Sequence, residues 1–84
     1  MNEDSVKLLQ DIERLHTTEQ GAVRIRRNLA LETEDPVSWC RQKILDRRAV
    51  ITRKGKNWYI ENGGCVITVN AGSLTIITAH RKQG

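Results

Sequence analysis

The sequence lacks several of the residues from which small proteins usually build a large core. Its 84 residues include no phenylalanine, two tryptophans, one tyrosine and a single proline. A chain of this length buries only about 60–65% of the surface that it exposes when unfolded, which leaves room for one core. We therefore expect a single domain over residues 1–84, with a helical part at 4–46 and a sheet part at 49–81.

Long apolar runs are also missing. The longest stretch without a charged residue, 62–80, is interrupted by glycines, asparagines and hydroxyl residues, so it does not predict a membrane span. The N-terminal segment MNEDSVKLLQ is acidic and has no basic region followed by an apolar one, which argues against a secretory signal. We expect a soluble cytoplasmic protein with no membrane partner.

Cysteine and histidine are too sparse to form a recognisable metal or redox motif. Cys40 and Cys65 lie far apart in the chain and match no paired-cysteine pattern. His16 and His80 are the only histidines, and neither has a clustered ligand beside it. The sequence thus predicts reduced cysteines that serve packing, no metal site and no cofactor.

Acidic residues are almost absent from the second half of the chain. Residues 1–46 hold seven Lys and Arg against nine Asp and Glu, whereas residues 47–84 hold seven against Glu61 alone. The two parts therefore carry formal charges of −2 and +6. Such an asymmetry favours a polyanionic or acidic partner for the C-terminal half.

The first half has helical periodicity. Apolar residues recur at helical spacing over 5–15, over a second segment that starts near Thr17, and over 37–46, where Asp35 and Pro36 form a typical N-cap and first-turn pair. The three apolar stripes are Leu8, Ile12 and Leu15; Ala22, Ile25 and Leu29; and Val37, Cys40 and Ile44.

The second half has the pattern of short strands separated by glycine turns. The β-rich runs are 49–53, 57–61, 65–70 and 74–80, and the turn Asn62-Gly63-Gly64 is typical of a hairpin. Connections this short allow only antiparallel neighbours, which predicts a meander. We expect an α+β fold in two layers, with three N-terminal helices packed on one face of a four-stranded antiparallel meander sheet.

Several segments resemble a known family. They are Gly55–Tyr59, Cys65–Asn70, Ser73–Arg81, His16–Glu19 and Arg24–Leu29, and they are similar to an uncharacterised bacterial family, domain of unknown function 3781. The resemblance implies a small bacterial or phage-borne cytosolic protein and transfers no catalytic residue. Helices followed by a meander is also the order in barnase-like and RelE-type small ribonucleases, which is an analogy of fold alone.

The strongest indication of function is the string Arg53-Lys54-Gly55-Lys56-Asn57-Trp58-Tyr59. It combines cations for phosphates with aromatic rings on which an unpaired base can stack, so it predicts binding of RNA or DNA. The alternative is a hairpin tip whose charge only keeps the protein soluble. The predicted nucleic-acid contacts are Arg53, Lys54, Lys56, Trp58, Tyr59, Arg81, Arg24 and Arg27. In a meander, Arg47, Arg48, Arg81 and Lys82 should gather at the opposite end of the sheet.

Catalysis is a weaker hypothesis. His80 ends a polar strand and is the candidate for proton transfer in a ribonuclease, while His16 is expected on the apolar side of the first helix. Glu61 is the only carboxylate of the basic half and thus its only candidate base. The alternative is that these polar residues are structural, with His80 and Glu61 in solvent.

A second class of function is protein binding. Trp39 falls opposite the apolar stripe of the third helix, so it either packs on another helix or is exposed for a partner. A meander also leaves both edge strands unpaired, which favours a homodimer through a sheet edge. We expect a small basic nucleic-acid-binding protein, with ribonuclease or toxin-like activity as an extension. The alternative is a protein-binding module such as a phage or mobile-element inhibitor or a toxin–antitoxin component.

Overall fold

The computed structural model describes residues 3–82. Helices come first and strands follow. The elements are α1 (Glu3–Gln10), the 3₁₀ turn η1 (Ile12–Arg14), α2 (Glu19–Leu29), α3 (Pro36–Leu45), β1 (Val50–Lys54), β2 (Asn57–Asn62), β3 (Cys65–Asn70) and β4 (Ile76–Arg81). No helix within the described range is long and apolar enough to cross a membrane.

The four strands form one antiparallel sheet in the order β1-β2-β3-β4. Tight turns join the first three strands, and glycine is needed there because Gly55, Gly63 and Gly64 have φ of 62°, 62° and 79°. The α+β class and the meander predicted from the sequence are therefore confirmed.

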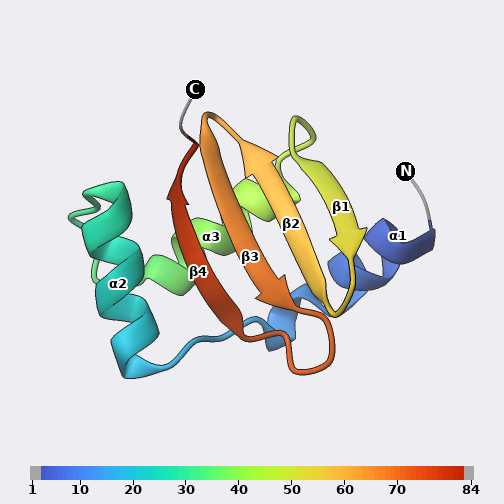
Figure 1. The fold of residues 1–84 in the computed structure, drawn as a ribbon, viewed down its shortest axis with the longest axis horizontal. Helices are drawn as coiled ribbons and strands as arrows, with labels where there is room; N and C mark the ends of the chain where they lie inside the picture. The colour runs from blue at the N-terminus through green and yellow to red at the C-terminus, as the bar shows by residue number, and fades with distance from the viewer. Residues whose placement is uncertain (1–2, 83–84) are drawn as a thin grey trace.

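The helices are not all placed as expected. α1 and α3 lie behind the sheet in Figure 1, whereas α2 lies beside β4. The reason is that α2 and the segment before it satisfy backbone groups of β4. The Thr17 hydroxyl donates to the Ile76 carbonyl at 3.0 Å, and the Asn28 amide donates to the Ala79 carbonyl at 3.3 Å. The prediction of three helices packed on one face therefore does not describe α2.

This arrangement also corrects the prediction that both sheet edges are unpaired. The His16 backbone N–H donates to the Leu74 carbonyl at 3.1 Å, and the Ile76 N–H donates to the His16 carbonyl at 2.7 Å. The free edge of β4 is thus partly covered by the protein's own chain. β1 pairs with β2 on one side, and no described strand pairs with its other side.

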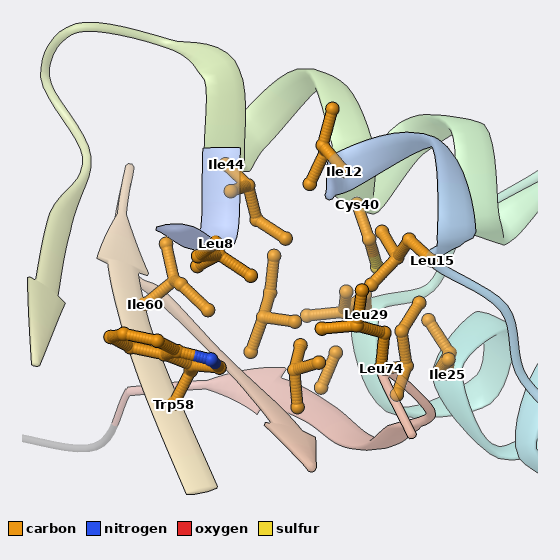
Figure 2. Close-up of a cluster of buried hydrophobic side chains, with 14 residues drawn as sticks. Leu8, Ile12, Leu15, Ile25, Leu29, Cys40, Ile44, Trp58, Ile60 and Leu74 are labelled. Carbon is orange, nitrogen blue, oxygen red and sulfur yellow. The ribbon is translucent and has the colours of Figure 1, made fainter. Parts of the chain in front are cut away.

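The hydrophobic core lies between the sheet and the helices behind it, as Figure 2 shows. The core includes residues of all three predicted stripes, although Val37 is only partly buried. In α2 the buried residue next to Ile25 and Leu29 is Gly21, and Ala22, which was predicted there, is not among the buried residues. The buried apolar residues are Leu8, Ile12, Leu15, Ile25, Leu29, Cys40, Ile44, Trp58, Ile60, Ile67, Val69, Leu74, Ile76 and Ala79.

Two local predictions were wrong. The first helix ends at Gln10, and after η1 the chain becomes extended, so His16 lies beside β4 instead of on a helix face. The last strand begins at Ile76 and contains a register shift opposite Thr68 and Val69. Because of that shift both Ile76 and Ala79 are buried, which strict alternation from Leu74 does not allow.

Candidate nucleic-acid interface

A basic pocket of about 370 Å³ lies where the β1–β2 hairpin meets α1 and the loop after β3. Among the side chains that the structure describes, its cations are Lys7, Arg53 and Lys56, and its carboxylate is Asp11. The remaining lining residues are Leu8, Trp58, Asn70, Ala71, Gly72 and Leu74. The structure thus brings two of the predicted phosphate contacts, Arg53 and Lys56, together at one pocket.

Arg53 is held in place by two interactions. Its Nε donates to the Gly55 carbonyl at 3.0 Å, and its guanidinium carbon lies 5.2 Å from the centre of the Trp58 ring. A cation at this distance from an indole is attracted by the negative face of the ring. Within residues 6–82 the terminal nitrogens of Arg53 make no hydrogen bond, so no side chain of that range competes with an anion for them.

Trp58 lines the pocket on the side that faces the hydrophobic core. Its side chain is only 2% exposed, and in Figure 2 it lies at the same end of the core as Leu8 and Ile60. Burial in the core makes it a floor of the pocket and leaves no free ring face for a base. The expectation that Trp58 stacks on nucleic acid is therefore not met by its placement, and the alternation of the strand leaves Tyr59 as the accessible ring.

Asn70 has a fixed amide orientation at the pocket rim. Its Oδ1 accepts from the backbone N–H of Gly72 and of Ser73, each at 2.9 Å. Its Nδ2 has no hydrogen-bond partner among the described residues. The loop thus presents the donor end of the amide, which suits an anion better than a cation.

The pocket cations form no ion pair with any side chain of residues 6–82. The ion pairs among the described side chains join Arg48 to Asp46 at 3.0 Å and Lys82 to Glu61 at 3.2 Å, and both lie at the other end of the sheet. Hydrogen bonds from Arg48 hold the pKa of the Asp46 carboxyl well below its usual range. The charge at the other end is therefore partly neutralised by ion pairs, whereas Asp11 lines the pocket but forms no ion pair with its cations.

Lys54 and Tyr59 lie on the opposite face of the sheet from the pocket. The register pairs Thr52 with Tyr59, Tyr59 with Thr68 and Thr68 with Thr78. A row of four hydroxyl side chains therefore crosses all four strands on the face that Figure 1 shows free of helices. Asn70, opposite Asn57 at the end of this face, also lines the pocket, so the two regions are continuous.

His80 and Glu61 share another row of the same open face. Glu61 pairs with Val66, and Val66 pairs with His80, so the two are separated by two strand spacings, or about 10 Å. The His80 ring is exposed, with Nδ1 3.1 Å from the Arg81 carbonyl. Arg81 points away from this face and donates to the Leu29 carbonyl of α2 at 3.4 Å. It therefore does not join the pocket.

His16 belongs to a chain of hydrogen bonds at the start of β4. Its Nδ1 lies 2.8 Å from the Arg14 carbonyl, which can only accept, so Nδ1 carries a proton. Its Nε2 lies 3.0 Å from the Thr75 hydroxyl, which is 2.7 Å from the Ser73 hydroxyl, itself 3.2 Å from Asn70 Oδ1. His16 and His80 thus lie near opposite ends of β4, and this separation does not fit a two-histidine mechanism.

The remaining predicted residues lie elsewhere. Arg24 and Arg27 are exposed on α2, around a shallow hollow of about 660 Å³ that also contains Glu19 and Glu34. Trp39 packs against the core and carries the Lys43 ammonium 5.3 Å from its ring centre. The alternative in which Trp39 packs within the protein is therefore the better description.

The cysteines show no sign of a reactive site. Both are free, and burial raises the pKa of the Cys40 thiol to about 12. Among the side chains that the structure describes, residues 6–82, there is no cluster of three or more histidine, cysteine or acidic residues that could hold a metal ion.

Two pocket residues, Lys7 and Asn70, were not among the predicted contacts. Lys7 reaches the pocket only because α1 packs behind β1, which is a tertiary contact between distant segments. Asn70 could have been singled out from the pattern Asn-Ala-Gly-Ser, because asparagine before a glycine turn commonly binds the backbone that follows it.

Comparison with known proteins yields a family without an assigned activity. No curated protein and no solved structure matches the chain. One family model matches residues 9–80, which is most of the chain, and it includes the segments whose resemblance is described above except for Arg81. The chain therefore belongs to the family described as "Protein of unknown function (DUF3781)".

Proposed function

We propose that this protein binds single-stranded RNA or DNA at the β1–β2 hairpin. The observation that carries the proposal is the basic pocket, in which Lys7, Arg53 and Lys56 gather around one hollow. Cations that contact phosphates release counterions condensed on the nucleic acid, and this is the main source of sequence-independent affinity for nucleic acids.

The open face of the sheet supports the same proposal. Tyr59 is half-buried there and offers a ring on which a base can stack, and the hydroxyls of Thr52 and Thr78 lie in the same row. Lys54 lies at the end of this face nearest the pocket. A strand that starts in the pocket can therefore continue around the hairpin tip onto the open face.

The test is binding of a labelled single-stranded RNA at several salt concentrations, with the wild type and a double variant, Lys54→Glu with Lys56→Glu. Each lost phosphate contact should lower the slope of log affinity against log salt by about 0.7 for a single strand. We therefore expect weaker binding and a slope that is smaller by roughly one unit or more.

The matched control is Arg24→Glu with Arg27→Glu, which changes the net charge equally but on α2. Binding in this control should stay closer to wild type, because the carboxylates of Glu19 and Glu34 already accompany these arginines. Equal affinities and slopes for wild type and the hairpin variant would refute the proposal. A defined protein co-purifying without nucleic acid would then favour the protein-binding module, including a homodimer through the β1 edge.

Ribonuclease activity is the second candidate function. It is favoured by the presence of Glu61 and His80 in one row of the open face, where a carboxylate and an imidazole can act as base and acid on either side of a bound phosphodiester. Glu61 would remove the 2′-hydroxyl proton, and His80 would protonate the leaving oxygen.

Cleavage of a mixed RNA substrate decides this second candidate. His80→Ala and Glu61→Gln should each abolish cleavage, while His16→Ala should retain it because His16 lies near the other end of β4. Undiminished cleavage by His80→Ala would remove His80 from the mechanism. If the wild type does not cleave RNA, the protein binds nucleic acid without hydrolysing it.

A further inference from the structure

We infer that the basic pocket takes a terminal phosphomonoester of a nucleic-acid strand, and that the protein therefore recognises phosphorylated strand ends. This inference rests on the proposed binding of nucleic acid and names the part of the ligand that enters the pocket. It is carried by the charge of the pocket, by the segments that surround it and by the donors left unpaired at its rim.

The charge of the pocket matches a monoester better than an internal phosphate. Lys7, Arg53 and Lys56 with Asp11 give the described lining residues a net charge of +2. A phosphomonoester carries about −1.5 to −2 at pH 7, whereas the phosphodiester inside a strand carries −1. Binding a terminal phosphate therefore neutralises the pocket almost completely.

The shape of the pocket favours the end of a strand. It is lined by three separate segments, namely α1, the β1–β2 hairpin and the loop that contains Ala71 and Gly72. Its apolar lining comes from Leu8, Trp58 and Leu74, which are 1%, 2% and 4% exposed. A volume of about 370 Å³ is near the lower limit for small-ligand sites, about 300 Å³, so it suits one nucleotide.

The donors at the rim are held in place before a ligand arrives. Arg53 is fixed by its bond to the Gly55 carbonyl and by the Trp58 ring, and its terminal nitrogens can bind two phosphate oxygens at once. Asn70 presents its Nδ2 because Oδ1 is occupied by the backbone of the loop. Asp11 remains as an acceptor for a ribose hydroxyl or a base amino group of the same nucleotide.

The experiment compares short single-stranded RNAs of one sequence that end in a 5′-phosphate, a 3′-phosphate or hydroxyls only, at one fixed salt concentration. Charged hydrogen bonds contribute enough that a phosphorylated end should bind at least about tenfold more tightly than a hydroxyl end. The variant Lys56→Gln should remove most of this preference. Lys54→Gln removes an equal charge from the open face next to the tip, so it should weaken binding of all three RNAs alike and keep the preference, since Lys54 does not line the pocket.

The possible results distinguish recognition of a phosphorylated end from nucleic-acid binding in general. A preference for one phosphorylated end, or for both, supports the inference and says which end enters. Equal affinity for phosphate and hydroxyl ends, with salt-dependent binding retained, overturns the inference and leaves nucleic-acid binding standing. Absence of binding to every RNA overturns both. If inorganic phosphate displaces the phosphorylated RNA as well as unlabelled RNA does, the ligand is free phosphate and the assignment to a strand end is wrong.

Discussion

Ala30, the residue after α2, has a backbone conformation that suits glycine better than alanine. Its φ and ψ are 53° and 45°, in the left-handed region, and its N–H bonds back to the carbonyls of Arg26 and Arg27. This is the position at which helices commonly end with glycine, because a Cβ there approaches the following carbonyl oxygen. The side chain of Ala30 is exposed, so its removal costs no core packing.

The substitution Ala30→Gly should therefore stabilise the protein. The left-handed conformation costs an L-residue about 1–2 kcal/mol, and glycine removes that cost. Glycine also makes the unfolded chain more flexible, which costs about 0.4–1 kcal/mol. The difference is a stabilisation of roughly 0.8 kcal/mol, which in a domain of this size corresponds to a rise in Tm of about 3–6 °C.

Thermal unfolding followed by circular dichroism measures the effect, and Ala22→Gly is the matched control. Ala22 lies inside the same helix, where glycine costs about 1 kcal/mol, so the same chemical change should lower Tm there. Opposite signs at the two sites are the expected result. A decrease in Tm for Ala30→Gly as large as that for Ala22→Gly would refute the argument from backbone conformation.

Other perturbations have equally definite expected outcomes. Leu74 is buried and has a φ of 59°, which is strained for any residue but glycine. Both Leu74→Gly and Leu74→Ala lose about 3 kcal/mol of packing, but glycine relieves the backbone strain, so it should lower the free energy of unfolding in urea by less. The reverse order would contradict a strained backbone at Leu74. Cys65 should react with a thiol reagent in the native protein and Cys40 only on unfolding. Because burial raises the pKa of Cys40 to about 12, stability should fall as pH rises from about 9 to 12, and less in Cys40→Ala. The Asp46 carboxyl accepts hydrogen bonds from Arg48, so its pKa should lie below the usual range in an NMR pH titration. Its contribution to the stability of the fold is therefore present above pH 3.8 and is lost as the pH falls below it. A normal titration midpoint would contradict the hydrogen bonds to Arg48.

The elements whose patterns are local could be predicted from the sequence. Asp35 accepts from the Ser38 N–H at 3.0 Å and Pro36 opens α3, as their residue types indicate. The turn at Asn62-Gly63-Gly64 needs positive φ at its two glycines, and glycine adopts positive φ freely, so the sequence favours this hairpin. These features depend on a few neighbouring residues, so they can be recognised without knowing the fold.

The candidate site was predictable only in part. The basic string around Gly55 marked the hairpin, and two of its cations, Arg53 and Lys56, do line the pocket. Trp58 and Tyr59 alternate on the strand, so only one ring can stay accessible, and the apolar partner Ile60 two residues on favours Trp58 as the buried one, as the structure has it. Lys7 lines the pocket only because α1 packs next to β1, and no local pattern in the sequence specifies that packing.

The sequence by itself determined the order of helices and strands, the antiparallel meander and the separation of acidic and basic halves, because each follows from nearby residues or from short connections. The tertiary structure decided the rest. His16 pairs with the start of β4 instead of lying on a helix, and α2 lies at the sheet edge instead of behind the sheet. The register shift near Val69 places both Ile76 and Ala79 in the core. Each of these outcomes satisfies hydrogen bonds or buries side chains between segments distant in the chain, so its energy is set only when those segments meet.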